Sequence, residues 1–356
     1  EMCIRDSYKS GENKIIRHIK IETLDPFGTD IADTSKKAIS YFEKGGNIVH
    51  IKTRRFAIRN RLLFKEGDNF DKIEMYESER IIRSSDFVGD VSVRIDPDYI
   101  SKDSVDIIIR EQDRWSIYPF GAIGGNYKAG FIDKNIVGTG QQLEASLFKA
   151  RLFDSTLVNY RFSYFVPYIK RTFITAGIIY NRERGNEYRG ISINRGFYSP
   201  LARWAGGIDF FNYELIRQLA SIDSSVIQIQ NIRYWSQDLW AGFAFPIRGS
   251  SYQNRTTKFV VAGRVFNKNY ITPLNLAFDP LLNQQNSTTY LMNFGITQRG
   301  FYKDKFIYKY GVTEDVPIGA MVSATLGYQK RPHDERYYMG LKSSYGVKLE
   351  GGNVSG

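Results

Sequence analysis

The chain has 356 residues, of which 42% are hydrophobic and 24% are charged, a composition compatible with a folded protein of two or three domains. Its net charge of +11 is unevenly placed, because residues 1–116 hold 21 Lys and Arg against 22 Asp and Glu, whereas the remainder holds 28 against 16. The basic residues of the second part lie among aromatic residues at strand spacing, without a clustered patch or a basic helix, which argues against nucleic-acid binding. Only 11 of the 52 aromatic residues precede position 117, so we place a domain boundary near Trp115.

The first ten residues, EMCIRDSYKS, read like neither a mature N-terminus nor a signal peptide, because they contain no apolar core and no small-residue cleavage site. We expect residues 1–10 to be a non-native or artefactual N-terminus and leave them out of the fold prediction. They include Cys3, the only cysteine, so the rest of the chain has no disulfide. No stretch approaches 18 consecutive apolar residues, which excludes a transmembrane helix.

Residues 12–115 predict a small α+β domain with the element order β-α-α-β-β. A strand is expected at 15–22, and residues 24–47 are expected to form a loop inserted after it. The first helix is expected to begin after Thr53 and to be amphipathic. Its expected buried residues are Phe56, Leu62 and Leu63.

A second helix is predicted by the spacing Asp71-x-x-Glu74, which is that of a capping box, after a turn at Gly67 and Asp68. Met75, Ile81 and Ile82 give this helix one apolar face. The polar residues expected to face solvent are Glu77, Glu79 and Arg80.

Two strands with an alternating pattern complete this domain. In VSVRI, the apolar residues Val91, Val93 and Ile95 alternate with polar ones, and SVDIIIRE repeats the pattern at 104–111. A period of two gives each strand one buried face. The sequence DPDYISKD between them is rich in turn formers, so we expect a hairpin.

The run of short motifs LLFKEGDNFD, ESERIIRSSDFVGDVSV and VDIIIREQDRWS resembles a POTRA domain. More closely, it resembles the POTRA domain next to the barrel in the BamA/TamA-like outer-membrane assembly superfamily, in forms common in Bacteroidetes. The resemblance extends over about 100 residues, the length of one ordinary small domain.

The second part alternates differently, with one apolar face and one face of Gly, Ser, Thr, Asn, Arg and Lys. In 318–328 the apolar row is Ile318, Val322 and Leu326, in 158–166 it is Val158, Phe162 and Val166, and in 239–247 it includes Leu239, Phe243 and Phe245. Segments of about nine to eleven residues with aromatic residues at their ends are typical of membrane-barrel strands. A soluble all-β domain would also alternate, and remains the alternative for this pattern alone.

The stretches at 121–147 (GAIGGNYKAGFIDKNIVGTGQQLEASL) and 310–328 (YGVTEDVPIGAMVSATLGY) resemble an early and a later strand pair of the same superfamily. About eleven strand-like segments follow Trp115, whereas the superfamily has sixteen strands. We therefore expect residues 116–356 to be the N-terminal part of an antiparallel transmembrane β-barrel, in a chain truncated at both ends. QRGF at 298–301 matches the superfamily's late loop motif by letters only, since it lies in an alternating segment.

The resemblance implies an outer-membrane protein with a periplasmic POTRA-like domain, which receives unfolded chains by strand addition and inserts or exports them through the barrel. It implies no cofactor, no metal and no catalytic residue. The implied partners are unfolded outer-membrane or secreted proteins, outer-membrane lipid, and periplasmic chaperones or lipoproteins. The client-binding edge is expected at 88–95, with Val91, Ser92, Val93, Arg94 and Ile95. The first barrel strand, which would act as a lateral gate, is expected to include Ile117, Pro119, Gly121, Ile123 and Gly125.

Two other functions remain open from the sequence. A passive channel would use basic lumen residues such as Arg161 and Lys342 to favour anionic solutes. A barrel-embedded hydrolase would need a catalytic site, and His333 with Asp334 is the one pair that the sequence offers. No spacing of His or Cys residues suggests a metal site.

Overall fold

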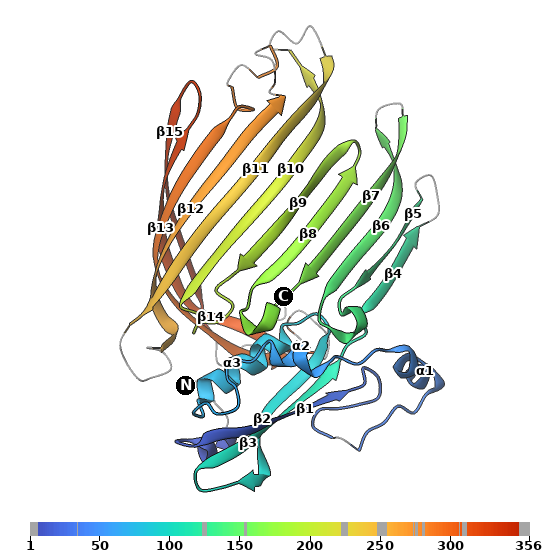
Figure 1. Ribbon diagram of the computed structural model, residues 1–356, viewed down its shortest axis with the longest axis vertical. Helices are drawn as coiled ribbons and strands as arrows, with labels where there is room; N and C mark the ends of the chain where they lie inside the picture. Colours follow the sequence, from blue (N-terminus) through green and yellow to red (C-terminus); the bar gives the residue numbers. More distant parts are fainter. Residues whose placement is uncertain are drawn as a thin grey trace.

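The structure, a computed structural model, describes residues 6–348 except 34, 123–126, 153–154, 222–226, 248–254, 273, 275–276, 280–281, 306 and 308–311. These residues form a three-stranded sheet with its helices, and a twelve-stranded sheet whose tilted strands curve round like the wall of a barrel (Figure 1). We call them the small sheet and the large sheet. The small sheet and its helices lie beneath one end of the large sheet (Figure 1).

Residues 6–113 form the N-terminal unit. Its small sheet has the order β1-β3-β2, in which β1 runs parallel and β2 antiparallel to the central β3. The elements are η1 (Asp6–Gly11), β1 (Ile15–Leu24), α1 (Tyr41–Val49), α2 (Arg55–Arg59), α3 (Lys72–Arg83), β2 (Val88–Ile100) and β3 (Ser104–Asp113). The β-α-α-β-β prediction is confirmed, with one further helix, α1, inside the insertion.

The hydrophobic core of the described chain is confined to the N-terminal unit. Met75 and Ile82 of α3 pack against Val91 and Val93 of β2 and Ile107 of β3, all of them buried. The Asp71 carboxylate caps α3 by accepting from the backbone N–H groups of Ile73 at 2.8 Å and Glu74 at 3.4 Å, as the sequence predicts. None of the described helices has the length and apolarity needed to cross a membrane.

Two predictions in this unit were wrong. The insertion is not all loop, because Ser40 and Glu43 form a reciprocal capping box that begins α1. A helix does begin after Thr53, and Leu62 is buried as predicted, but the helix is only the five-residue α2, which buries Ala57 and Ile58 and leaves Phe56 46% exposed.

The large sheet is antiparallel throughout, and each strand pairs with its neighbours in the sequence. It contains twelve described strands where about eleven were predicted, and several are longer than the predicted nine to eleven residues, up to 20 in β11. The strands are β4 (Ile117–Ala122), β5 (Lys128–Asp133), β6 (Gln142–Leu152), β7 (Ser155–Val166), β8 (Thr175–Glu183), β9 (Asn186–Arg195), β10 (Trp204–Ala220), β11 (Ile227–Pro246), β12 (Thr257–Thr272), β13 (Ser287–Lys305), β14 (Thr313–Lys330) and β15 (Glu335–Gly346). Short 3-10 turns η2 (Ile136–Gly138) and η3 (Ile169–Arg171) lie in two of the connections.

The two faces of the large sheet differ as the alternation predicts. On β11, Leu239, Phe243 and Phe245 are each more than half exposed, whereas Ser236 and Asp238, at the alternate positions just before them on the same strand, are buried. We call these the outer and the inner face. Exposed apolar residues of the other predicted rows are Val158, Phe162, Val322 and Leu326.

Aromatic residues gather at two levels of the outer face. At one level Tyr328 of β14 lies between Tyr290 and Tyr337, with ring centroids 6.3 and 5.6 Å away. At the other level Phe243 lies opposite Trp204 in the register of β10 and β11. An outer face that is apolar between two aromatic levels is the pattern expected of a membrane barrel.

Candidate functional site

Helix α3 lies between the two sheets, at the lower end of the large sheet in Figure 1. All its residues from Met75 to Arg83 are buried. The apolar side faces the small sheet, and the polar side faces strands and connections of the large sheet. The prediction that Glu77, Glu79 and Arg80 face solvent was therefore wrong, because residues far along the chain provide their partners.

Glu77 and Arg80 form the first half of this contact. Arg80 Nη2 lies 2.9 Å from Glu77 Oε2 and donates to the backbone carbonyl of Tyr198 at 2.8 Å. The Arg80 guanidinium also lies 4.2 Å from the ring centroid of Phe301 on β13. Ser199 Oγ donates to Glu77 Oε2 at 2.9 Å. Each buried charge thus has an opposite charge and a hydrogen-bonding partner, which offsets its desolvation.

Arg83 and Glu79 form the second half. Arg83 Nη1 donates to both carboxylate oxygens of Asp315 on β14, at 2.7 and 2.8 Å, and Arg83 Nη2 donates to Glu79 Oε1 at 2.5 Å. Lys303 of β13 also pairs with Glu79. Burial lowers the pKa of Arg83, but the charges of Asp315 and Glu79 outweigh it and raise that pKa above its ordinary value. The guanidinium is held fully charged at this interface.

The first turns of α3 are docked as well. Tyr76 Oη donates to the backbone carbonyl of Phe301 at 2.9 Å, and Asp71 pairs with Arg255 at 2.7 Å. Burial raises the pKa of the Tyr76 phenol, so this group remains a hydrogen-bond donor. The QRGF sequence at 298–301 lies on strand β13 and not in a loop, consistent with a chance match to the loop motif.

A second set of contacts, apart from those of α3, connects the N-terminal unit to the start of the large sheet. Asp113, at the end of β3, lies 2.8 Å from His50 Nε2 and accepts from the backbone N–H of Thr53 at 2.9 Å and from the Thr53 hydroxyl. Asn135, in the β5–β6 connection, donates to Thr53 Oγ1 at 2.7 Å. The backbone N–H of Arg54 also donates to the carbonyl of Gly138 at 2.8 Å.

Glycine is required at position 138 in this set of contacts. Its φ of +72° favours glycine, and an added Cβ would collide with the carbonyl oxygen of Lys52. Residues 114–116 then lead directly from β3 to β4. The first strand of the large sheet is therefore held beside the N-terminal unit.

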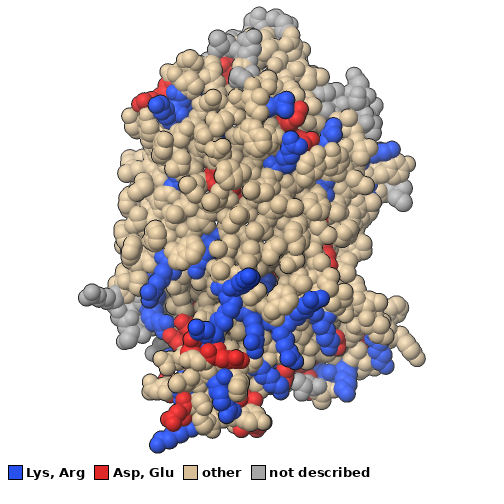
Figure 2. Space-filling view, viewed as in Figure 1, with Lys and Arg blue, Asp and Glu red and all other residues tan. Residues whose placement is uncertain are grey.

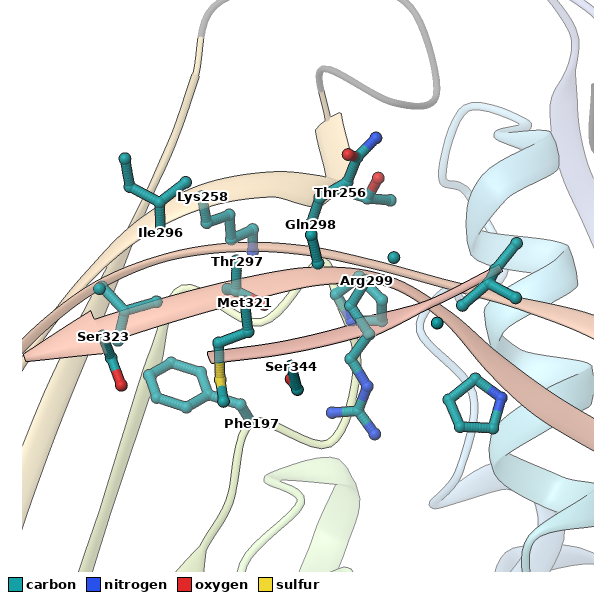
Figure 3. Close-up of a pocket in the computed structure, with 18 of the residues that line it drawn as sticks. Phe197, Thr256, Lys258, Ile296, Thr297, Gln298, Arg299, Met321, Ser323 and Ser344 are labelled. Carbon is teal, nitrogen blue, oxygen red and sulfur yellow. The ribbon is translucent and has the colours of Figure 1, made fainter. Parts of the chain in front are cut away.

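A cavity of about 520 Å³ opens on the inner side of the large sheet, near the docked helix. Figure 3 shows Phe197 and Met321 at one side of it and Arg299 directed into it. Lys258 on its wall is held by donation to the carbonyl of Ala202 at 2.7 Å. The space lies among the last three described strand pairs, β12 to β15.

The predicted client-binding residues lie on an edge strand, since β2 ends the order β1-β3-β2. Val91, Val93 and Ile95 are buried as predicted. The edge is not open at its centre, however. The Val93 N–H donates to Glu79 Oε2 at 3.0 Å, and the Val93 carbonyl accepts from Tyr8 Oη at 2.8 Å.

Tyr8 comes from η1, within the segment that the sequence prediction left out. Its side chain is 2% exposed and packs on Phe70 with ring centroids 5.9 Å apart. Because the Val93 backbone groups point away from β3, those of Ser92 and Arg94 point toward it. The alternation of apolar and polar residues does not predict which backbone groups of β2 point away from β3.

The predicted gate residues lie on β4, whose one partner among the described strands is β5. The Lys134 N–H donates to the carbonyl of Ser116 at 3.0 Å, so even-numbered residues of this strand direct their backbone groups to β5. Ile117, Pro119 and Gly121 direct theirs to the free edge. Ile123 and Gly125 lie outside the described residues.

This edge has few hydrogen-bonding groups to offer. Pro119 has no N–H, and the Ile117 carbonyl accepts from the Trp115 indole at 2.5 Å. Gly121 is the one gate residue described whose N–H and carbonyl both face the edge without such a limitation. A strand that pairs here gains fewer ladder bonds than at an ordinary edge.

Two of the residues suggested for a channel or a hydrolase, Arg161 and Asp334, have other partners. Arg161 lies on the inner face with its guanidinium 3.3 Å from Glu144 and 3.5 Å from Glu183, so its charge is balanced. Asp334 pairs with two arginines, Arg331 at 3.1 Å and Arg336 at 3.0 Å. Among the described residues, no group of three or more His, Cys, Asp or Glu could hold a metal.

No family model matches the chain, and no curated protein matches it. Among solved structures it is similar to BamA from Haemophilus ducreyi lacking POTRA domains 1-3, at 13% identity and a TM-score of 0.32, over 93% of this chain and 82% of that one. It is also similar to CdiB from Acinetobacter baumannii, at 11% identity and a TM-score of 0.33, over 95% and 81%.

Proposed function

We propose that this protein is an outer-membrane assembly or translocation factor, in which the N-terminal unit receives unfolded outer-membrane or secreted chains and the large sheet inserts or exports them. The observation that carries this proposal is the donor-poor free edge of β4, held beside the N-terminal unit by a connection of three residues, 114–116. Neither a passive channel nor a hydrolase needs such an edge.

The outer face supports membrane embedding. Its row on β11 runs from Trp235 to Phe245 and is apolar except for Gln237, and at the rise and tilt of a barrel strand this length spans about 25 Å. That height matches the apolar band of outer-membrane barrels. A soluble all-β domain would bury such a row, since contiguous exposed apolar surface promotes association.

The β4 edge supports a role in strand addition. In lipid, every backbone N–H and C=O must be paired, so a client segment can enter the bilayer at low cost only while it is hydrogen-bonded to another strand. A strand that closes the barrel against β4 finds no N–H to accept from at Pro119. It also competes with the Trp115 indole for the Ile117 carbonyl. We call the pairing between β4 and a closing strand the seam. The seam opens more easily than the neighbouring ladders, and a client strand can replace the closing strand there.

The docked helix supports coupling between capture and insertion. Helix α3 carries buried ion pairs to β13 and β14 on one side and packs under β2 on the other. It also lies at the lower end of the large sheet (Figure 1), where a passive channel would need an open mouth. A client bound at the small sheet is thereby kept close to β4.

The test is reconstitution of the full chain in phospholipid vesicles, followed by addition of a urea-unfolded eight-stranded barrel protein as client. We expect the client to fold into these vesicles faster than into empty vesicles, as measured by its heat-modifiable gel mobility. A client rate equal to that of empty vesicles, together with free efflux of a small anionic dye, would favour the channel and reject the proposal.

A further inference from the structure

The insertion between β1 and α2 exposes an unusual amount of apolar surface. Tyr41 and Phe42 are each 93% exposed and Ile48 is 83% exposed, although all three lie on an ordered helix, α1. The apolar residues exposed in the segment 39–51 are Ile39, Tyr41, Phe42, Ile48, Val49 and Ile51. We call this set the 39–51 surface. A contiguous exposed apolar patch of this kind marks an interaction site.

Helix α1 turns its apolar face outward, whereas a helix of a soluble domain turns that face toward the core. At 100° per residue, Tyr41, Phe42, Ile48 and Val49 share one arc of the helix. The opposite side is attached to the protein through Asn47, whose side-chain amide exchanges two hydrogen bonds with the Phe27 backbone, at 3.2 and 3.0 Å. The polar side thus faces the protein and the apolar arc faces outward.

Contacts at the end of α1 place this apolar arc next to the start of the large sheet. His50, at the end of α1, contacts Asp113 at 2.8 Å and lies 6.3 Å from the Trp115 ring, and Phe27 lies 6.0 Å from the same ring. Two residues later the outer face begins at Ile117, which is 41% exposed. Figure 1 shows α1 projecting sideways beyond the lower ends of β4 and β5. The 39–51 surface therefore continues the outer face of the sheet at its lower end.

The charge of the surrounding segment is strongly positive. Residues 36–55 contain six Lys and Arg and one Glu. Within the described part of the chain, Lys37, Lys44, Arg54 and Arg55 form no ion pair, and Lys44, Arg54 and Arg55 are exposed. Figure 2 shows Lys and Arg gathered over the lower part of the molecule, where the large sheet meets the N-terminal unit. Anionic phospholipid headgroups complement this charge.

We propose that the 39–51 surface is an interfacial membrane anchor, which lies in the headgroup region of the bilayer leaflet beside β4 and binds anionic phospholipid. This inference rests on the proposed embedding of the large sheet in a bilayer. Tyr41, Phe42 and Ile48 reach about 5–10 Å into the boundary between headgroups and acyl chains, and the flanking basic residues contact phosphate groups. The anchor fixes the N-terminal unit against the membrane at the edge where a client strand enters.

The test uses the full chain with Cys3→Ser and a single new cysteine carrying an environment-sensitive fluorophore. The probe position is Phe42→Cys on the apolar arc, and the matched control is Lys44→Cys, an exposed position of the same helix about 100° from the centre of that arc. Val322→Cys on the outer face of β14 reports whether the large sheet is embedded. Each protein is reconstituted in phosphatidylcholine vesicles containing phosphatidylglycerol, with or without a spin-labelled lipid that quenches fluorescence on contact.

We expect the lipid quencher to remove most of the fluorescence at positions 42 and 322 and little of it at position 44. Arg54→Gln with Arg55→Gln is expected to lower the quenching at position 42, as is omission of phosphatidylglycerol. Quenching at 322 without quenching at 42 overturns the anchor and leaves the membrane embedding intact. No quenching at 322 rejects the embedding, and the anchor with it. The fluorophore at position 42 also reports whether its surroundings are apolar. If that apolar signal is lost when the protein-to-lipid ratio is lowered, the surface contacts a second copy of the chain, which also overturns the anchor.

Discussion

Arg83 of α3 and Asp315 of β14 are 232 residues apart in the chain, yet both carboxylate oxygens of Asp315 accept from Arg83 Nη1, at 2.7 and 2.8 Å. The two side chains are 4% and 11% exposed. A pair this buried fixes the position of the N-terminal unit on the large sheet, because either charge left alone would be poorly solvated.

Arg83→Ala is expected to destabilise the docked arrangement by about 3–5 kcal/mol, because it removes the cation that Asp315 and Glu79 share and leaves the Asp315 carboxylate without its hydrogen-bonded partner, while Glu79 keeps only Lys303. Hydrogen exchange of α3 in the reconstituted protein measures the effect, which should appear as loss of protection through the helix. Arg17→Ala is the control, since Arg17 pairs with Asp106 at a site where the Arg17 side chain is 45% exposed. Equal loss of protection in the two variants would contradict the docking role.

Phe162 and Ser163 are neighbours on β7 that point to opposite faces of the large sheet. Phe162→Arg is expected to cost about 2–4 kcal/mol in a bilayer if Phe162 faces the lipid core. Ser163→Arg should cost much less, because Glu144 lies opposite Ser163 on β6 and can pair with the new charge. Urea titration of the protein in vesicles compares them. Equal tolerance would reject a lipid-facing outer face.

The alternation of the sequence was sufficient to predict the outer rows, because side chains of a strand point alternately to two faces whatever their distant partners are. The same local rule failed for α3. Its polar residues were assigned to solvent, but Glu77 and Arg80 meet Ser199 and Tyr198, more than 100 residues later. No spacing within the helix encodes such partners.

The missed helix α1 was within reach of the sequence. Ser40-x-x-Glu43 is a capping-box spacing, the same signal that correctly located the start of α3 at Asp71. The edge strands show a different limit. Periodicity predicts which side chains share a face, but which backbone groups of β2 and β4 face the edge depends on hydrogen bonds to partner strands. Those bonds were visible only in the structure.

Tyr8 occupies the Val93 carbonyl at the centre of the predicted client-binding edge. Tyr8→Phe removes this hydrogen bond, keeps the ring in the core, and should cost only about 0.5–1.5 kcal/mol. If β2 captures extended clients, the variant should capture more, because one edge acceptor is freed. Crosslinking of an unfolded client to a photoreactive residue at position 92 measures capture. An unchanged or absent crosslink in both proteins would remove β2 from the docking role.

Glu111 predicts a pH dependence of the N-terminal unit. Burial, together with the neighbouring charge of Asp113, raises the pKa of Glu111 well above 4.5. The folded state therefore holds a proton that the unfolded state releases, so the contribution of Glu111 to stability is fully present below about pH 4.5 and is lost as the pH rises through its folded-state pKa. Glu111→Gln should flatten this fall and stabilise the unit above it. Hydrogen exchange of β3 against pH tests this, and an unchanged slope in the variant would contradict it.

The last prediction concerns the seam at β4. Pro119→Ala adds one N–H to the free edge, because the backbone of residue 119 faces away from β5. One more net hydrogen bond is worth about 0.5–1.5 kcal/mol, so pairing across the seam should tighten and client insertion should slow about two- to tenfold. The vesicle assay with an unfolded eight-stranded client measures the rate.

Ile117→Pro is the opposing variant, since it removes a second N–H from the same edge and leaves the ladder to β5 unchanged. It should insert the client at least as fast as the wild type, whereas Phe120→Pro, which breaks the ladder to β5, should destabilise the strand itself. The opposite directions of Pro119→Ala and Ile117→Pro separate an effect of edge hydrogen bonding from a general loss of structure. If both variants insert the client at the wild-type rate, strand exchange at β4 is not the step by which the client enters the membrane.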